Sequence, residues 1–433
     1  MATERGRLRA VEAAVPELPV GARGLVWFLG LGAFGLAWSI TTVAAYVPPL
    51  LARFTESDTL VGLVLASEGW FAVFLPLFVG PMSDATETSL GRRRPYMLLA
   101  LAPMAATLAL VAFMPSFGAM ALALFAFFFA YYVYEPPYRG LYPDLLPPTV
   151  FGRAQGVQHL FRGAALGGAL VGGGFLFGVW HPFPFTLAAL VTALSCGAVL
   201  VLVREEPIRT RVPTRLRTNF GAPWRIVRRD RAVRRWLLAN TAWEAAFAGM
   251  RTFVVLYIIR GLDQPLYVSS VVLAIVAAGY VVAAVASGFW SDQFGLGRVI
   301  FGASAVYGAT LFAATFAESW HWWYVALVAV GAAGGGTVMT LAWGLLFKIM
   351  PESDQGTVAG LGITTKGLGL LIGPLAAGAA IDIFHPFLRG TDGYAAIWPT
   401  VAIPILAVMP LVGALADTEA ERSGVRSRDS RPA

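Results

Sequence analysis

Long hydrophobic stretches, separated by short polar or basic connections, recur twelve times along the chain. Each stretch reaches about the 18–20 residues that a helix needs to cross a bilayer, and none shows the alternating pattern of a membrane barrel strand. Because lipid offers the backbone no hydrogen-bond partner, stretches of this length predict helices. The expected spans are 24–50, 59–82, 95–115, 117–142, 154–180, 183–203, 236–260, 267–290, 298–317, 321–349, 357–384 and 395–415.

The composition supports an all-α membrane protein. Of 433 residues, 57% are hydrophobic and only 13% are charged, which is about half the charged fraction of a soluble domain. The single cysteine, Cys196, lies in a hydrophobic stretch, so the sequence predicts no disulfide framework and no thiolate metal site. We expect neither a metal nor a cofactor. Residues 1–23 carry charges and prolines without the apolar core of a signal peptide.

Arginines indicate the orientation of the spans. They concentrate at 5–23, 92–94, 204–235 and 422–431, whereas the alternate connections carry little more than Arg53, Arg260 and Arg389. By the positive-inside rule, both termini are expected on the cytoplasmic side of the inner membrane. The basic segment 204–235 could also be interpreted as a nucleic-acid patch, but charge beside anionic lipid headgroups explains it better. The expected partner is therefore the bilayer and not a nucleic acid.

An internal repeat divides the chain into two halves. An offset of 204 carries Arg162 and Gly163 onto Lys366 and Gly367, and 181–183 onto 385–387, which are both His-Pro-Phe. Matching spans are six apart, so the halves share one orientation. The expected organisation is a cytoplasmic tail at 1–23, a six-helix bundle at 24–203, a basic linker at 204–235, a second six-helix bundle at 236–415 and a tail at 416–433.

A glycine, aspartate and arginine motif follows the second span and returns after the eighth. It reads Gly80-Pro81-Met82-Ser83-Asp84 with Gly91-Arg92-Arg93-Arg94-Pro95, and its echo reads Gly288-Phe289-Trp290-Ser291-Asp292 with Gly297-Arg298. This pair resembles the signature of the major facilitator superfamily. The resemblance implies a fold of two pseudo-symmetric six-helix bundles. It also implies a gating motif made by Gly80, Asp84, Gly91, Arg92, Arg93, Arg94, Gly288, Asp292 and Arg298. A merely topogenic basic turn is the alternative.

Two stretches are similar to one branch of that superfamily, the sucrose–proton and glycoside–cation symporters. They are 92–95, Arg-Arg-Arg-Pro, and 137–145, Pro-Tyr-Arg-Gly-Leu-Tyr-Pro-Asp-Leu. The branch implies a sugar or glycoside as solute. Plant sucrose symporters carry a proton-coupling aspartate about eleven residues before the arginine, where this chain has Phe128. If the chain is proton-coupled, another acid must serve.

Apart from residues near the ends of the spans, seven side chains that are charged at neutral pH fall inside the expected spans, where they are costly unless paired or hydrated. Such groups either fix helix positions as permanent pairs or take part in function. Glu135 and Arg139 are four residues apart and close enough to pair, whereas Glu244 and Arg251 lie about 10 Å apart along their helix. Burial and a nearby arginine shift the pKa of a carboxyl group in opposite directions, so it can load and release a proton. Glu244 and Glu68 lead this coupling hypothesis, and the full set is Glu68, Glu135, Arg139, Arg162, Glu244, Arg251 and Lys366.

Aromatic side chains with interspersed polar groups suit a sugar ring, and the resemblance places the first, fourth, seventh and tenth spans around the cavity. Core packing and lipid contact are the common alternative for any single aromatic residue. Together with Gln158, which lies one turn before Arg162, the candidates are Trp38, Tyr46, Tyr131 and Trp243.

These patterns favour a secondary transporter over its rivals. The chain has no His-Glu-x-x-His, Gly-x-Ser-x-Gly or aspartate pair at helix spacing, so we expect no enzyme. The predicted function is proton-coupled or other cation-coupled alternating access that moves a small polar solute, with the chain acting as a monomer. A drug or organic-anion exporter and a non-transporting assembly or sensor relative remain alternatives.

Overall fold

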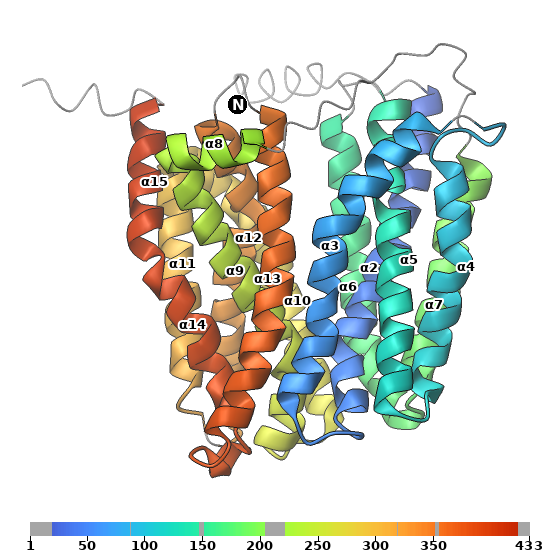
Figure 1. Ribbon diagram of the computed structural model, residues 1–433. Coiled ribbons are helices and arrows are strands. Elements are labelled where there is room, and N and C mark those ends of the chain that lie inside the picture. The colour runs from blue at the N-terminus through green and yellow to red at the C-terminus, as the bar shows by residue number, and fades with distance from the viewer. Residues whose placement is uncertain are drawn as a thin grey trace, which may run out of the picture.

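The computed structural model describes residues 20–86, 88–146, 151–203, 221–317, 319–350 and 355–422. These residues form helices, and none of them lies in a strand (Figure 1). The first six long helices are α2 (Val20–Leu51), α3 (Asp58–Ala85), α4 (Arg94–Leu110), α5 (Phe117–Leu145), α6 (Phe151–Val179) and α7 (Phe183–Leu202). After the short helix α8 (Gly221–Arg229) come α9 (Arg231–Leu256), α10 (Leu266–Phe294), α11 (Leu296–Ala314), α12 (Tyr324–Ile349), α13 (Gln355–Phe384), α14 (Ile397–Ala407) and α15 (Met409–Arg422). Short helices follow α4 at Val111–Phe113, α9 at Tyr257–Gly261 and α13 at Arg389–Thr391 and Tyr394–Ala396.

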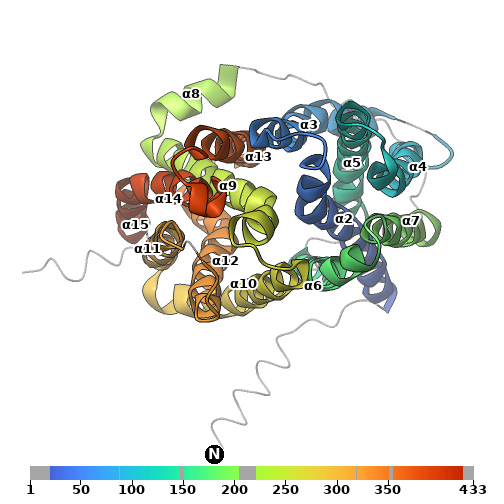
Figure 2. The same cartoon turned by 90° about the horizontal axis from the view of Figure 1, so that it is seen from below.

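Twelve of these segments are long and apolar enough to cross a membrane, which confirms the predicted number. The two bundles of six are arranged side by side, with α2 to α7 on one side and α9 to α15 on the other (Figure 2). Across the division, α3 packs against α13, α6 against α10 and α2 against α9. The fold is therefore the expected all-α arrangement of two six-helix bundles.

Two helix ends differ from the predicted boundaries. The linker was expected to run to residue 235, but α9 begins at Arg231 because the Asp230 carboxylate accepts hydrogen bonds from the backbone N–H groups of Ala232 and Val233. The expected tail at 416–433 begins too early, since α15 continues to Arg422. The outermost parts of both tails and residues 204–220 lie outside the described part of the chain.

The last span is broken between α14 and α15. Pro410 stands at the start of α15, where its missing N–H leaves the helical hydrogen bond at that point unmade. The two helices together still form one candidate span, Tyr394–Glu421.

The two halves touch closely at one end, which we call the closed end. A Cβ atom built on Gly69 of α3 would lie 2.5 Å from the backbone nitrogen of Leu371 in α13, so only glycine fits there. Gly62 and Gly378 meet backbone atoms of the opposite half in the same way.

At the other end, the open end, α3 and α13 diverge (Figure 1). Positions Gly80 and Gly288 there have no atom within 4 Å of an added Cβ. Helix α8 lies across this end (Figure 1).

Candidate functional site

Glu68 of α3 joins the two halves at the centre of the molecule. Its Oε2 accepts a hydrogen bond from Arg251 Nη2 of α9 at 2.8 Å, and its Oε1 accepts one from the Tyr132 hydroxyl of α5 at 3.3 Å. The Glu68 side chain is 8% exposed, and that of Arg251 is 24% exposed. The Nε of Arg251 is buried and has no hydrogen-bond partner among the described residues.

Glu135 and Arg139 of α5 form the ion pair that their spacing predicts. Both Nε and Nη2 of Arg139 donate to the same carboxylate oxygen, Oε1, at 2.9 and 2.7 Å. The Glu135 side chain is 13% exposed, whereas Arg139 is 48% exposed. The arginine of the pair is therefore only half covered by the protein, although it belongs to an apolar span.

Three further charged side chains interact electrostatically with these pairs but form no ion pair of their own within the described residues. Lys366 of α13 interacts electrostatically with Glu135 and Glu244, and Arg162 of α6 interacts with Glu135 and Lys366. Within the described residues, none of Arg162, Glu244 and Lys366 has an oppositely charged group within ion-pair distance. All three are partly exposed.

The structure thus brings all seven predicted intramembrane charges into one place between the halves. We call this set the charge cluster: Glu68, Glu135, Arg139, Arg162, Glu244, Arg251 and Lys366. It contains three carboxylates and four cations, so its formal charge is 4 − 3 = +1. The uncommitted members are two cations and one acid, and they come from both halves.

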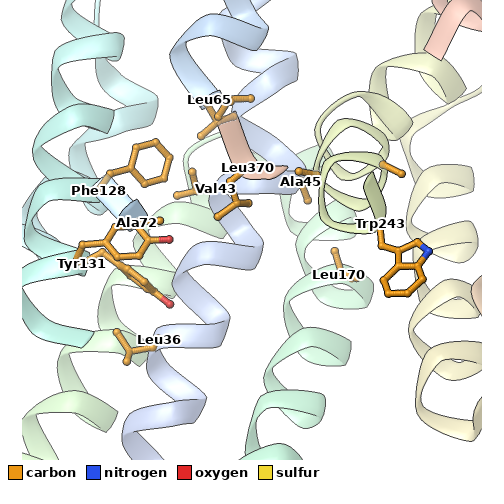
Figure 3. Packing of buried hydrophobic residues seen from close by; sticks show 14 of the residues in the cluster. Leu36, Val43, Ala45, Leu65, Ala72, Phe128, Tyr131, Leu170, Trp243 and Leu370 are labelled. Carbon is orange, nitrogen blue, oxygen red and sulfur yellow. The ribbon is translucent and has the colours of Figure 1, made fainter. Parts of the chain in front are cut away.

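The predicted aromatic residues divide between the cluster and the packed core. Tyr131 is 4% exposed and interacts electrostatically with Glu135 and Arg162, so it belongs at the edge of the cluster. Trp243 is fully buried, and Figure 3 shows it among the buried hydrophobic residues together with Tyr131 and Phe128. Phe128, at the position where the sucrose symporters carry an acid, is a core residue.

Trp38, Tyr46 and Gln158 lie at contacts of α2 and α6. The Trp38 ring packs where Gly168 of α6 leaves room for it, and the Tyr46 hydroxyl donates to the Leu170 carbonyl of α6 at 2.8 Å. Tyr46 is fully buried and Gln158 is 4% exposed. In this conformation Trp38 and Tyr46 join α2 to α6; Trp38 is partly exposed, whereas Tyr46 and Gln158 are buried.

The arginines of the predicted gating motif in the first half form a network at the open end. Arg93 Nε donates to Asp144 Oδ2 at the end of α5 at 2.9 Å, and Arg92 lies 3.4 Å from the other oxygen of Asp144. Arg94 donates to the Leu200 carbonyl of α7 at 2.6 Å. Gly91 has a φ of 100°, a backbone conformation that favours glycine in the turn before these arginines. The network ties α4 to α5 and α7 within the first half.

In the second half, the repeat position of Asp144 is occupied by a cation that makes a different ion pair. Adding 204 to Asp144 gives Lys348 of α12, which pairs with Glu419 of α15 at 2.9 Å. The Glu419 carboxylate also accepts hydrogen bonds from the backbone N–H groups of Leu296 and Gly297, at the start of α11. Arg298 is exposed. The side chains of Asp84 and Asp292 lie outside the described residues.

A carboxylate at the closed end was missed by the sequence analysis. Asp382 of α13 accepts hydrogen bonds from Ser57 Oγ at 2.7 Å and from the backbone N–H groups of Asp58 and Thr59 at 2.8 and 2.9 Å. It thereby caps α3 of the opposite half, where negative charge is favourable. In the sequence, Asp382 is a single acid near the end of the expected span 357–384. An acid at that place is typical of the edge of a hydrophobic stretch, so nothing local indicated its contact with α3.

Two more contacts cross between the halves at that end. The Tyr394 hydroxyl donates to Asp58 Oδ1 at 3.2 Å, and Arg260 Nη2 donates to the Ala52 carbonyl at 2.9 Å. Together with the Asp382 cap they form a polar seal over the close glycine contacts. The charge cluster therefore lies beneath a closed end and faces an end where the halves diverge.

This arrangement, twelve spans in two bundles around buried charge, defines a multi-pass membrane protein of the carrier class. The family model of the Major Facilitator Superfamily matches residues 28–374, and the chain belongs to that family. Members of the family are generally carriers and not enzymes.

Solved structures show the same fold at low sequence identity. The nucleoside transporter NupG superposes with a TM-score of 0.70 at 17% identity, over 90% of this chain and 98% of that one. A bacterial homologue of the human lysosomal transporter Spinster, in an inward-facing and occupied conformation, gives 0.68 at 15% identity, over 96% and 100%. The POT family transporter PepTSo gives 0.71 at 10% identity, over 94% and 99%. No protein with a curated description matches the sequence.

Proposed function

We propose that the protein is a proton-coupled secondary transporter that moves a small polar organic solute across the inner membrane by alternating access. The observation that carries the proposal is the charge cluster, in which Arg162, Glu244 and Lys366 lie between the halves without ion-pair partners in the described chain. Buried charge of this kind is costly in a membrane protein unless it serves a solute or ion.

Glu244 is the proposed proton carrier. It interacts electrostatically with Lys366 and Arg251, so the charge of its carboxylate affects groups of both helices α13 and α9. Glu68 is committed to Arg251 and Tyr132, and Glu135 to Arg139. Glu244 is therefore the carboxylate whose protonation breaks no existing ion pair.

The proposed orientation follows from arginine placement. With both termini cytoplasmic, the open end faces the cytoplasm and the polar seal faces outward. The conformation then corresponds to an inward-facing state. Rocking of the halves would separate Asp382 from α3 and expose the charge cluster to the outside.

A sugar or glycoside is the leading solute because two stretches resemble the glycoside symporter branch. An organic anion is the second candidate, and the +1 formal charge of the cluster favours it. The Arg251 side chain is 24% exposed, and a guanidinium can donate to either a hydroxyl or a carboxylate oxygen. Both candidates are small polar organic solutes, and transport assays distinguish the sugar from the organic anion.

The decisive experiment is uptake into proteoliposomes of the purified protein under an imposed pH gradient. Radiolabelled disaccharides, glycosides and monocarboxylates would be presented in parallel, with and without a protonophore. Accumulation of a sugar or an anion that the protonophore abolishes is the expected result. Uptake that only equilibrates and does not respond to the pH gradient would contradict proton coupling. A lack of counterflow with every tested class of compound would contradict the proposed solute.

A further inference from the structure

A cleft of about 530 Å³ lies at the closed end of the molecule, on the division between the two halves. We call it the closed-end cleft. Its first-half lining comes from the ends of α2 and α6. Its second-half lining comes from the end of α9, the short helix Tyr257–Gly261 and the start of α10. Helices α2, α6, α9 and α10 adjoin one another around the division (Figure 2). A ligand in the cleft therefore contacts both halves.

The charged groups of this cleft are basic. Arg53 and His181 come from the first half and Arg260 from the second, and all three are exposed. Among the described residues, no carboxylate lines the cleft, and none lies within ion-pair distance of either arginine. Asp58 of the polar seal interacts electrostatically with Arg260, but it belongs to the buried side of the seal. The cleft therefore favours a negatively charged ligand.

The arginine distribution of the chain makes this clustering unusual. Arginines are concentrated in the connections of the opposite end, and the connections of the closed end carry only Arg53, Arg260 and Arg389. Two of these three line the same cleft, one from each half. The rule that places basic residues on one side of a membrane does not account for a cluster on the other side.

His181 lacks the acidic partner that its repeat-mate has. The repeat-mate His385 pairs with Asp392 at 2.9 Å, whereas the position equivalent to Asp392 in the first half, 392 − 204 = 188, is Ala188. His181 instead packs edge to face on Phe177, with ring centroids 4.8 Å apart. Its ring nitrogens add a third polar group to the cleft without adding a negative charge.

The remaining lining is mostly apolar. Phe177 stacks on the buried Tyr46 ring with centroids 5.8 Å apart, and Leu256, Ile259 and Leu266 line the side of the second half. Pockets for small organic molecules typically measure about 300–1,000 Å³ and combine an apolar wall with a few polar groups. The closed-end cleft agrees with this description in both size and lining.

From these observations we propose that the closed-end cleft binds an amphiphilic anion, which carries one carboxylate or phosphate group on an apolar body. The anionic group lies near Arg53, His181 and Arg260, and the apolar body lies against Phe177 and Ile259. A free organic acid and the headgroup of an anionic lipid both have this chemistry. The site is separate from the charge cluster and does not rest on the proposed transport function.

The test uses phenylpropionate and its neutral amide, phenylpropionamide, which share a ring and chain and differ in charge. Their binding to the full chain in phosphatidylcholine nanodiscs would be measured by isothermal titration. Gly178→Phe places a ring in the cleft, at a position where an added Cβ meets no atom within 4 Å. Gly118→Phe is the control, because Gly118 is exposed at the start of α5, has equally open surroundings and does not line the cleft.

A second pair of variants tests the charge. Arg53→Gln removes one cation of the cleft, and Arg389→Gln removes an exposed arginine of the same end that does not line it. We expect phenylpropionate to bind the unmodified protein, Gly118→Phe and Arg389→Gln several-fold more tightly than the amide. Gly178→Phe should abolish this preference, and Arg53→Gln should weaken phenylpropionate several-fold.

Equal binding of the two compounds to the unmodified protein would overturn the proposal. Phenylpropionate binding that is unchanged in both Gly178→Phe and Arg53→Gln would do the same. Binding that is lost in Lys366→Gln but kept in Gly178→Phe would place the anion in the charge cluster and so contradict the cleft.

Native mass spectrometry distinguishes the two sources of the anion. The protein would be extracted from membranes that contain phosphatidylglycerol, and the retained lipid molecules would be counted. Fewer retained molecules on Gly178→Phe than on Gly118→Phe would identify a lipid headgroup in the cleft. Equal numbers, together with the expected binding of phenylpropionate, would identify a free organic acid.

Discussion

Arg251 and Glu68 form an ion pair of 2.8 Å that crosses from one half of the molecule to the other. Because the two residues belong to different halves, any movement that separates α3 from α9 must break the pair or carry it along. Its carboxylate is almost fully buried, so this contact depends on the packing of the halves more than a surface ion pair would.

Replacing Glu68 should destabilise this conformation more than replacing Glu135. Removing one partner of a buried ion pair costs about 3–5 kcal/mol, and the partial exposure of Arg251 places Glu68→Gln at the lower end. Glu135→Gln should cost about 1 kcal/mol or less, because Arg139 is half exposed. Thermal unfolding of both variants checks the order.

The double variant Glu68→Gln with Arg251→Gln tests whether the loss comes from the uncompensated arginine. It should recover much of the stability, because neither member of the pair is then left charged without the other. Equal melting temperatures for Glu68→Gln and Glu135→Gln would contradict the burial argument.

Much of this architecture could be predicted from the sequence because it depends on local patterns. Span number follows from hydrophobic length, and the Glu135–Arg139 pair follows from a spacing of four on one helix. The Arg251–Glu68 pair could not be predicted, since its partners are 183 residues apart and lie on helices of different halves. The same applies to Asp382, whose partner is the start of a helix 324 residues away.

Local signals were also misjudged where charge and helix overlap. The charge of the arginines at 231, 234 and 235 favours a linker, whereas Asp230 before them is a favourable N-cap residue and starts the helix. Hydropathy locates the apolar part of a helix, but a cap decides where the helix begins.

Glu244→Gln should separate coupling from binding. The variant is expected to keep solute exchange in counterflow, because exchange requires no net change of protonation. Accumulation driven by a pH gradient should fall at least ten-fold. Glu56→Gln, which changes an exposed carboxylate at the closed end, is the matched control and should transport normally. If Glu244→Gln still accumulates solute in response to the pH gradient, another acid must carry the proton.

Asp382→Asn should loosen the closed end. The amide is neutral and offers a single acceptor oxygen, so the three hydrogen bonds to Ser57, Asp58 and Thr59 cannot all be kept at full strength. We expect a shift towards conformations open at that end. A thiol reporter at Ser270→Cys, a buried position of α10, would be read in a Cys196→Ser background.

Labelling of that reporter by a membrane-impermeant maleimide should be several-fold faster with Asp382→Asn than without it. Glu56→Gln again serves as the control, because its side chain is exposed near the same end. A labelling rate unchanged by Asp382→Asn would mean that the glycine contacts alone hold the end shut.

The glycine contacts can be tested separately through Gly69. An alanine there would place its Cβ 2.5 Å from the Leu371 nitrogen and 2.6 Å from the Gly367 carbonyl oxygen, and backbone atoms cannot rotate away as a side chain can. Gly69→Ala should therefore force α3 and α13 apart, which lowers the melting temperature and raises maleimide labelling at Ser270→Cys. Gly118→Ala is the control, since an added Cβ at Gly118 meets no atom within 4 Å. If both alanine variants behaved like the unmodified protein, the close approach of α3 and α13 would not be what holds the closed end together.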